Sequence, residues 1–497
     1  MALELQAEDE GALTVRIAGA LREEILRGRL RAGQRLPGSR TLARQLGVNR
    51  NTITAAYDAL DAEGWIRTEA ARGRWVSAPE EGARPPRRDD GPRAAMPGRL
   101  GFGLGDEPIT SHPVVPSATF DLSGGLPDVR LVPWTLLARA YRRALERRAA
   151  RLLDYGPVEG LPELREQLAT MLADARGLAC SADDVFVTRG SQMALWLVGA
   201  AVLRPGDRVA VEAYGYRPAW DALRAHGAEL VPVPVDDDGL DVARLAELAR
   251  RSELRAVYLT PHHQYPTTVT LSGPRRLALL DVARAHRLAI VEDDYDHEFH
   301  YEGRPVLPLA TLDRGGHVIY VGTLSKVLAP GLRLGYVVAP APLLRRLAVL
   351  RSTLDRQGDL AVEAAVAELM EDGEVQRHAW RARRSYLARR DALVEELGSR
   401  LGDRLVLRPP SGGLALWAQA LELDVDQWVE QAAALGVRIR PARQFAFDGR
   451  RRPFVRMGFA RHDEGELRRA ARRLATAASR VPSSRGEALS DRASSDR

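Results

Sequence analysis

The spacing of apolar residues predicts a small helical unit at the start of the chain. The first helical repeat of apolar positions is Ile17, Leu21 and Ile25. A second helix is expected to begin at Ser39, which would cap it, and a third follows the turn at 47–49. Two short strands are expected at 65–68 and 74–77. This order predicts a winged helix-turn-helix over residues 11–77, a unit that places its last helix in a DNA groove.

A different pattern runs from about residue 119 to 478, where short apolar strands alternate with helices. The expected strands are 185–187, 208–212, 256–260, 289–292, 318–321 and 334–339. This pattern predicts an α/β domain with a mainly parallel central sheet, followed after about 340 by a smaller C-terminal α/β subdomain. Residues 78–118 are rich in Pro, Gly and Arg and predict a flexible linker, and residues 479–497 predict a disordered tail.

The positive charge is concentrated in the small unit. The formal net charge is +6, and residues 11–77 hold twelve Arg against six Asp plus Glu, a difference of +6. The rest of the chain is therefore close to neutral, which favours a polyanion-binding module beside a core of another kind. The acidic, polar start is not typical of a signal peptide, and Cys180 has no partner for a disulfide. We expect a cytoplasmic protein that makes no contact with a membrane.

One residue stands out in the composition. Among the 72 Lys and Arg residues, Lys326 is the single lysine. Arginine can replace lysine as a solvated charge, but its guanidinium stays protonated and cannot form an imine. A lone lysine in an arginine-rich chain therefore indicates a role that needs a primary amine.

The neighbourhood of Lys326 suits an aldehyde cofactor. The lysine follows an expected strand, and ligands of open α/β sheets bind beyond the carboxyl ends of strands. The acidic pair that includes Asp293 also follows an apolar strand, where a carboxylate can keep a pyridine nitrogen protonated. Tyr295, two residues further on, can reach a ring hydroxyl.

Further groups suit the phosphate and the ring of such a cofactor. Ser191 and Gln192 lie where a strand turns into a helix, and N–H groups at a helix start bind anions. Ser325 and Arg333 add a hydroxyl and a guanidinium suited to a phosphate dianion. Tyr216 follows another strand and can stack on a ring.

The segment from Leu36 to Thr52 resembles the GntR-type winged helix. The resemblance rests on Leu36-Pro37-Gly38-Ser39-Arg40 and on Gly47-Val48-Asn49-Arg50-Asn51-Thr52. It implies DNA contacts, and Arg50, Asn51 and Thr52 open the third helix, where side chains and free N–H groups face the groove. The expected DNA-binding residues are Arg40, Arg50, Asn51, Thr52, Arg72 and Gly73.

Residues of about 119–478 resemble the fold-type I aminotransferases, which carry pyridoxal 5′-phosphate. In that family the lysine corresponds to Lys326, the partner of the pyridine nitrogen to Asp293 and that of the 3-hydroxyl to Tyr295. The other cofactor residues that the resemblance implies are Tyr216, Ser191, Gln192, Ser325, Arg333 and Tyr155. Tyr155 corresponds to a tyrosine that reaches the phosphate of a neighbouring subunit, so a homodimer is implied. Arg456 corresponds to the arginine that grips a substrate carboxylate.

The chain departs from that family at one contact of the cofactor. Many members have an asparagine where this chain has Tyr265, and no asparagine follows Asn51. His262, His263 or Gln264 could replace it, and the His pair could equally be polar loop residues. The loss weakens the case for transamination more than the case for cofactor binding. We expect no metal site, because no further ligand cluster joins His297 and His300 with their nearby acids.

The combination of both domains resembles the MocR-type subfamily of GntR regulators. It implies a transcriptional regulator that binds operator DNA and senses an amino compound or pyridoxal phosphate through an internal aldimine on Lys326. The alternative is an aminotransferase with an accessory DNA-binding module, and a third hypothesis is a cofactor-free regulator built on the same fold. We expect a regulator rather than an enzyme, although a residual aminotransferase half-reaction stays open.

Overall fold

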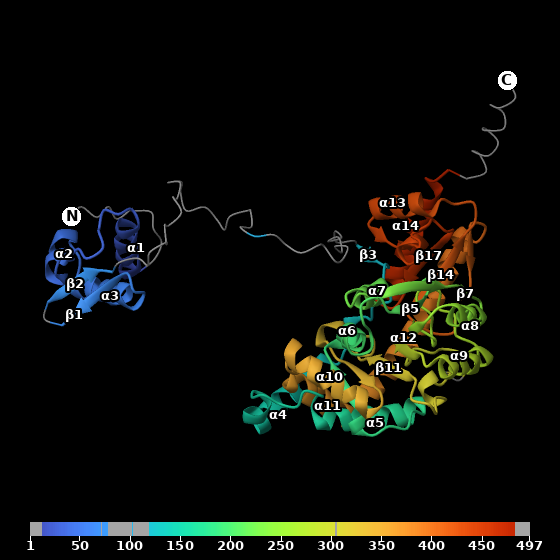
Figure 1. The fold of residues 1–497 in the computed structure, drawn as a ribbon. Helices are drawn as coiled ribbons and strands as arrows, with labels where there is room; N and C mark the ends of the chain where they lie inside the picture. The colour runs from blue at the N-terminus through green and yellow to red at the C-terminus, as the bar shows by residue number, and fades with distance from the viewer. Residues whose placement is uncertain (1–11, 71, 78–101, 103–118, 304–305, 483–497) are drawn as a thin grey trace. The chain divides into compact units, whose positions relative to one another are not determined.

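The computed structural model describes residues 12–70, 72–77, 102, 119–303 and 306–482, and the chain forms two compact units, 1–105 and 106–497 (Figure 1). The predicted linker at 78–118 lies outside the described residues except for Phe102. The predicted disordered tail, 479–497, starts too early, because Ser479 still belongs to a helix, Glu464–Ser479, and Val481 is buried; its residues from 483 onward lie outside the described part. No helix within the described ranges is both long and apolar enough to cross a membrane.

The small unit is a winged helix-turn-helix. Its elements are α1 (Leu13–Leu26), α2 (Ser39–Leu46), α3 (Arg50–Ala62), β1 (Ile66–Glu69) and β2 (Gly73–Val76). The two strands form an antiparallel hairpin, and Ile17, Leu21 and Ile53 are completely buried in the core. The prediction that Ser39 caps the second helix is wrong. Gly38 is the N-cap, and the hydroxyl of Ser39 instead accepts a 3.4 Å hydrogen bond from Nε of Arg50.

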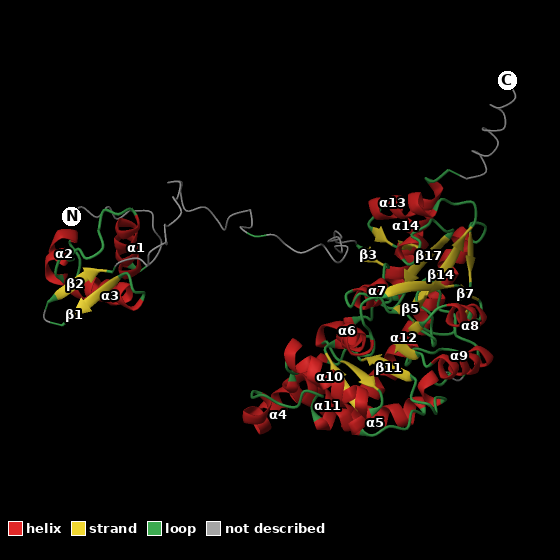
Figure 2. Ribbon diagram, viewed as in Figure 1, coloured by secondary structure: helices red, strands yellow, loops and turns green. Residues whose placement is uncertain are grey.

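A seven-stranded sheet forms the centre of the large unit. The strands, in spatial order, are β4 (Val185–Thr188), β12 (Gly335–Val338), β11 (Val318–Thr323), β10 (Ala289–Asp294), β9 (Leu254–Leu259), β5 (Arg208–Glu212) and β6 (Glu229–Val233). β12 is antiparallel to both neighbours and the others run parallel. Figure 2 shows strands of the large unit in yellow among the helices in red. β6 is a strand that the sequence prediction missed. It contains Pro232, and a proline, which lacks an N–H donor, is tolerated in an edge strand.

Helices cover both faces of this sheet. One face packs against α6 (Gly190–Val202), α7 (Arg217–Arg224) and α10 (Ala341–Leu354). The other packs against α5 (Pro162–Arg176), α8 (Val242–Arg251), α9 (Gly273–His286) and α11 (Leu360–Glu371), and α4 (Trp134–Leu152) lies on α11. Because both faces are buried, the central strands are almost continuously apolar, as expected for a parallel sheet.

A smaller α/β subdomain follows the central sheet. Its antiparallel sheet has the order β13 (Leu405–Leu407), β14 (Ala415–Ala420), β17 (Phe454–Gly458) and β16 (Arg440–Pro441), with α12 (Glu374–Leu401), α13 (Val425–Ala434) and α14 (Glu464–Ser479) packed around it. β3 (Phe120–Asp121) pairs with β15 (Val437–Arg438), which ties the start of the large unit to this subdomain. The remaining short elements are η1 (Val129–Leu131), η2 (Ala182–Asp184), β7 (Val235–Asp236), β8 (Gly239–Leu240), η3 (Leu309–Thr311), η4 (Pro330–Leu332) and η5 (Ala442–Gln444).

Candidate functional site

Lys326 lies in the turn that follows β11, beyond the carboxyl end of that strand. It is mostly buried and lies within electrostatic reach of Arg456, Asp296 and Asp293. Burial lowers the pKa of Lys326 to about 8, and the positive Arg456 adds to this effect against the opposing influence of the two carboxylates. The amine is therefore partly unprotonated near neutral pH, and the unprotonated amine is the form that attacks a carbonyl carbon.

Asp293, the expected partner of a pyridine nitrogen, is the last residue but one of β10, the strand that pairs with β11. Its side chain is buried, with 4% exposure, and Oδ2 accepts a 2.8 Å hydrogen bond from the hydroxyl of Tyr258. Oδ1 is buried as well and has no hydrogen-bond partner among the described residues. Burial raises the pKa of Asp293 to about 7, and Asp294 and Asp296 contribute to the rise. An unpaired buried acceptor at this place fits a protonated ring nitrogen.

Three tyrosines surround the same space. Tyr216 is the residue at the start of α7, and burial raises its pKa to about 12. The Tyr265 ring meets the Tyr216 ring edge-on at 5.5 Å and the Tyr295 ring at 6.0 Å. The hydroxyl of Tyr295 donates a 3.0 Å hydrogen bond to the backbone carbonyl of His263. Tyr265 was not among the predicted site residues, although its position in the motif, where the family has an asparagine, indicates that it lies near the cofactor.

The three residues expected to replace that asparagine are engaged in different ways. Nε2 of Gln264 donates to the backbone carbonyls of Tyr214 and Tyr265, each at 2.7 Å. Nδ1 of His263 lies 2.8 Å from Oδ1 of Asp296. His262 is buried with both ring nitrogens lacking a partner among the described residues. The loop therefore already uses the Gln264 amide, and the two histidines face a polar interior next to the cofactor residues.

The start of α6 lies against the β11–β12 connection, and the two segments form a candidate anion cradle. A Cβ added at Gly335 would lie 2.8 Å from the backbone nitrogen of Ser191, so the two segments are in very close contact. The Arg333 guanidinium lies against Gly190 and donates a 3.0 Å hydrogen bond to the backbone carbonyl of Arg189. Ser191 and Gln192 lie in the first turn of α6, where Nε2 of Gln192 donates a 2.7 Å hydrogen bond to the backbone carbonyl of Pro218. Ser325 and Arg333 lie in the connection, and the N–H of Ser325 donates to the hydroxyl of Thr323, which pairs with Gly335. Free N–H groups at a helix start and a guanidinium suit a phosphate.

Arg456 approaches the site from the smaller subdomain. It lies on β17, is 1% exposed, and its guanidinium carbon is 4.5 Å from the centre of the Tyr265 ring. Nε and Nη1 are buried without a hydrogen-bond partner in the described part of the chain. A Cβ at Gly125 would come within 3.1 Å of Nη2, so glycine there makes room for the guanidinium. A buried cation with two unused donors is suited to a carboxylate.

Tyr155 lies elsewhere. It follows α4, its side chain is 75% exposed, and the guanidinium of Arg356 lies over its ring at 4.7 Å. Within the described residues of one chain, the structure gives it no contact with Lys326 or with the anion cradle. A surface position is what a contact with a second subunit requires.

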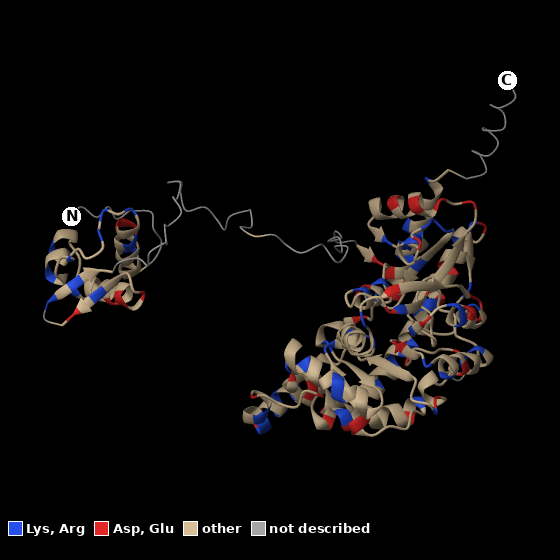
Figure 3. Ribbon diagram, viewed as in Figure 1, with Lys and Arg blue, Asp and Glu red and all other residues tan. Residues whose placement is uncertain are grey.

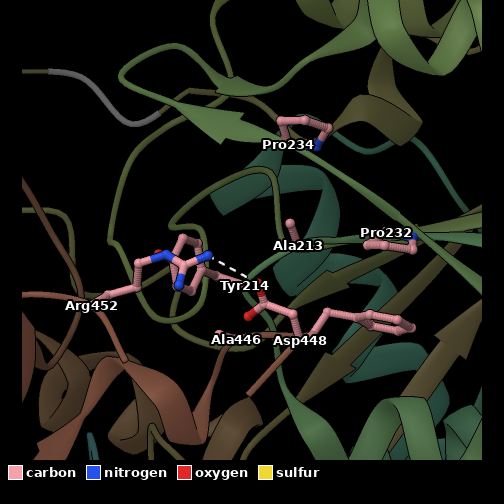
Figure 4. A pocket seen from close by; sticks show the side chains of 8 residues that line it. Ala213, Tyr214, Pro232, Pro234, Ala446, Asp448 and Arg452 are labelled. Atoms are coloured by element: carbon pink, nitrogen blue, oxygen red, sulfur yellow. Dashed lines mark hydrogen bonds and ion pairs between the residues drawn. The ribbon is translucent and has the colours of Figure 1, made fainter. Parts of the chain in front are cut away.

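A surface pocket lies beside this site rather than over the lysine. It has a volume of about 240 Å³ and is lined by Ala213, Tyr214, Pro232, Pro234, Ala446, Phe447, Asp448 and Arg452 (Figure 4). The ion pair between Asp448 and Arg452, 2.9 Å long, closes one side of it. Tyr214 links the pocket to the site, because its backbone carbonyl accepts the bond from Gln264.

The small unit presents an arginine-lined hollow between α2 and the start of α3. Its volume is about 640 Å³, and its lining includes Arg40, Arg44 and Arg50, which form no ion pair with a described residue. The side chain of Asn49 accepts a 2.8 Å hydrogen bond from the N–H of Asn51, which caps α3 and leaves Arg50 and Asn51 exposed. Arginines outnumber acidic residues in this unit (Figure 3).

The predicted wing tip lies between β1 and β2. Gly73 has φ +122°, a conformation that favours glycine, and a Cβ there would lie 2.9 Å from Nε of Arg35. Arg72 is exposed. Thr52, in the first turn of α3, is partly buried. The six predicted DNA-binding residues therefore lie on α2, on the first turn of α3 and at the wing.

Comparison with known proteins gives two family matches and several similar proteins. Residues 125–474 match the class I and II aminotransferases, and residues 13–76 match the bacterial regulatory proteins of the gntR family. The chain is 34% identical to "Probable rhizopine catabolism regulatory protein MocR" of Rhizobium meliloti, over 86% of this chain and 85% of that protein. It is 33% identical to "HTH-type transcriptional regulator TauR" of Rhodobacter capsulatus, over 91% and 93% of the two chains.

The large unit also has similar solved structures. The crystal structure of the multiple substrate aminotransferase from Thermococcus profundus superposes with a TM-score of 0.69 at 31% identity, covering 74% of this chain and 93% of that one. The aminotransferase domain indicates pyridoxal 5′-phosphate as the cofactor, and the gntR domain indicates DNA binding. The chain belongs to the MocR-type subfamily of GntR transcriptional regulators, with a fold-type I aminotransferase domain behind its winged helix.

Proposed function

We propose that this regulator senses a small amino compound, or pyridoxal phosphate itself, at Lys326 and transmits the signal to operator DNA. The observation that carries the proposal is that the single lysine lies within electrostatic reach of Asp293, whose Oδ1 is buried without a hydrogen-bond partner among the described residues. Pyridoxal phosphate supplies an aldehyde that condenses reversibly with primary amines, and a pyridine ring that withdraws electrons. Lys326 offers such an amine with a lowered pKa, and Asp293 offers the acceptor for a ring N–H.

The neighbouring residues take the other parts of the cofactor. We assign the phosphate to Ser191, Gln192, Ser325 and Arg333, which surround the start of α6. Tyr216 would stack on the ring, and Tyr295 would bond to the 3-hydroxyl. These roles use groups that the fold already holds in place, such as Tyr295 through its bond to the carbonyl of His263.

Arg456 would select the effector. Its two unpaired donors lie over Tyr265 and within electrostatic reach of Lys326, so a molecule that carries both an amine and a carboxylate can meet both residues. The effector class that fits is therefore an amino compound with a carboxylate. A bidentate contact with this buried guanidinium would distinguish it from a simple amine.

The response would reach DNA through the winged helix. We assign the DNA contacts to Arg40, Arg50, Asn51, Thr52, Arg72 and Gly73, over residues 11–77. An effector can change transcription only by binding one of two conformations of the protein more tightly, when these conformations also differ in affinity for DNA. Operator DNA lies in the cytoplasm of a bacterium, which is where we place the protein.

We further propose a homodimer of the large unit, over 119–478. The segment 129–155, around α4, exposes several large apolar side chains, and α4 lies at the periphery of this unit (Figure 1). These side chains are Val129, Trp134, Tyr141, Leu153 and Tyr155. An apolar surface of this kind is typical of a subunit interface. In such a dimer Tyr155 would reach the phosphate of the partner's cofactor.

The decisive experiment compares the wild type with Lys326→Ala and Lys326→Arg. We expect both variants to lose the visible absorbance of the bound cofactor and the effector-dependent change in operator affinity, while basal DNA binding persists. Gel shifts and absorbance spectra measure these properties. An effector response that persists in Lys326→Ala would refute the proposed sensing mechanism. Repeated release of keto acid from an amino acid would favour the aminotransferase hypothesis instead.

A further inference from the structure

Three histidines from distant parts of the chain meet in the interior of the large unit. His262 and His263 lie in the loop after β9, and His300 follows β10 and forms a bridge with Gly412. Their exposed fractions are 3%, 1% and 7%. One ring nitrogen from each lies within 4.8 Å of the other two. Three buried nitrogen donors that converge at this distance match the number of protein ligands in many zinc sites.

Four ring nitrogens of this cluster lack partners among the described residues. Both ring nitrogens of His262, Nε2 of His263 and Nδ1 of His300 are buried without a hydrogen bond to any described residue. Buried polar atoms are almost always paired, so several unpaired nitrogens at one place indicate a missing ligand.

Asp296 orients one of these ligands. Its Oδ1 lies 2.8 Å from Nδ1 of His263, which assigns the ring proton to Nδ1 and leaves the lone pair of Nε2 facing the cluster. A carboxylate behind a histidine is the usual support of a metal ligand. A Cβ at Gly412 would lie 2.1 Å from Nε2 of His263, so glycine at this position keeps that nitrogen unobstructed.

The surroundings can balance the charge of a cation. The His297 ring stacks on His262 at 4.5 Å and is held by Asp294 through a 2.9 Å contact. Oδ2 of Asp296 is a further buried acceptor without a partner in the described ranges. Two carboxylates, Asp294 and Asp296, therefore lie next to the cluster, opposed by the positive charge of Arg276, which acts on His262.

We propose that His262, His263 and His300 form a buried site for a divalent transition-metal ion, with Zn²⁺ as the best fit. Three neutral imidazoles suit Zn²⁺ better than Mg²⁺ or Ca²⁺, which prefer oxygen ligands. The prediction of no metal site considered only His297 and His300 with nearby acids, since the sequence does not reveal that His262 and His263 lie beside His300. The proposed metal would sit next to the cofactor residues, because Asp296 also interacts with Lys326.

Equilibrium dialysis of the full-length protein, free of any affinity tag, tests the proposal. The protein is stripped with a chelator, reconstituted with pyridoxal phosphate and dialysed against micromolar Zn²⁺, and bound zinc is counted by mass spectrometry. We expect one zinc ion per chain. X-ray absorption of the zinc-loaded wild type should show a first shell of nitrogen and oxygen atoms, dominated by imidazoles, at about 2.0–2.1 Å. Wild-type protein that retains no zinc would overturn the proposal, and so would sulfur in the first shell.

Variants then assign the ligands. His262→Gln and His300→Gln should each weaken zinc binding at least about 100-fold, and Asp296→Asn about 10- to 100-fold. The control His286→Gln removes a histidine from the last turn of α9 and should bind zinc like the wild type. Cofactor absorbance and a cooperative thermal transition identify the variants that fold. Unchanged zinc binding in a folded His262→Gln or His300→Gln variant would refute the site, and if neither variant folds, the absorption spectrum of the wild type decides.

Discussion

The hydroxyl of Tyr258 donates a 2.8 Å hydrogen bond to Oδ2 of Asp293 and leaves Oδ1 of the same carboxylate without a partner. The two residues lie on neighbouring parallel strands, β9 and β10. The bond holds one oxygen of the carboxylate, while the other is buried, and the carboxylate lies within electrostatic reach of Lys326. Oδ1 of Asp293 is therefore available to a ligand, but leaving this buried oxygen unpaired costs the ligand-free protein some stability.

That cost should appear as a pH dependence of stability. The pKa of Asp293 in the folded protein is about 7, above its ordinary value of 3.8, so between these pH values the folded state holds a proton that the unfolded state has lost. Stability contributed by this group therefore falls as pH rises from about 4 to about 7. We expect cofactor-free Asp293→Asn to gain stability relative to the wild type over this window, on the order of a few kcal/mol.

Thermal unfolding of both cofactor-free proteins across this range measures the difference. Glu292 has a raised pKa as well, but it is present in both proteins, so its contribution cancels in the comparison. If the melting temperatures of the two proteins differ by the same amount at the acidic and at the neutral end of this pH range, the assignment of the raised pKa to Asp293 is wrong.

Lys326 should govern how fast the cofactor enters. Its pKa of about 8 means that the reactive, unprotonated amine increases as pH rises toward that value. We expect the rate of cofactor incorporation to rise about tenfold per pH unit well below pH 8 and to level off above it. Stopped-flow absorbance measures this rate. A rate that stays constant over this range would show that another step limits incorporation.

Arg456 should determine whether a carboxylate is recognised. Its replacement in Arg456→Gln removes the charged donors, so we expect an amino acid effector to bind about 100-fold more weakly while cofactor absorbance remains. Calorimetry with the effector and with the matching amine that lacks the carboxylate separates the contributions. The control Arg450→Gln changes an exposed arginine. Equal weakening for both ligands would argue against a role in carboxylate binding.

Gly335 should be essential to the anion cradle. In Gly335→Ala the new Cβ would lie 2.6 Å from the carbonyl carbon of Gly190 and 2.8 Å from the nitrogen of Ser191, both backbone atoms. The start of α6 must therefore shift, and we expect at least tenfold weaker binding of pyridoxal phosphate, about 1.4 kcal/mol or more. Gly331→Ala is the matched control, because no atom lies within 4 Å of its added Cβ. Fluorescence titration with the cofactor compares the two variants.

Arg50 should contribute a phosphate contact to DNA binding. Arg50→Ala should lower affinity for every DNA sequence and reduce the slope of log affinity against log salt by about 0.9. Arg29→Ala serves as the control, because Arg29 is paired with Glu24 at the end of α1. Fluorescence anisotropy at several salt concentrations gives both slopes, and identical slopes for the two variants would place Arg50 away from the phosphates.

The local sequence predicted most elements because their patterns are local. Helical spacing at Ile17 and Leu21, and apolar runs such as 289–292, report which side chains face a core within a single element. These signals predicted the winged helix and six central strands, whereas they missed β6, in which Pro232 weakens the strand pattern. They also placed the N-cap of the second helix at Ser39, one residue after Gly38, where the structure has it, because the backbone conformation decides which residue is the cap.

The site, too, could be predicted only in part from the sequence. The sequence by itself determined that the chain has one side-chain primary amine, at Lys326, and that acids, hydroxyls and arginines follow strands at family spacing. Tertiary structure alone decided that Oδ1 of Asp293 stays unpaired, that Tyr265 lies under Arg456, and that His262 meets His300. These relationships join residues tens to hundreds of positions apart. They depend on which strands become neighbours, and a repeating pattern within one element carries no information about that choice.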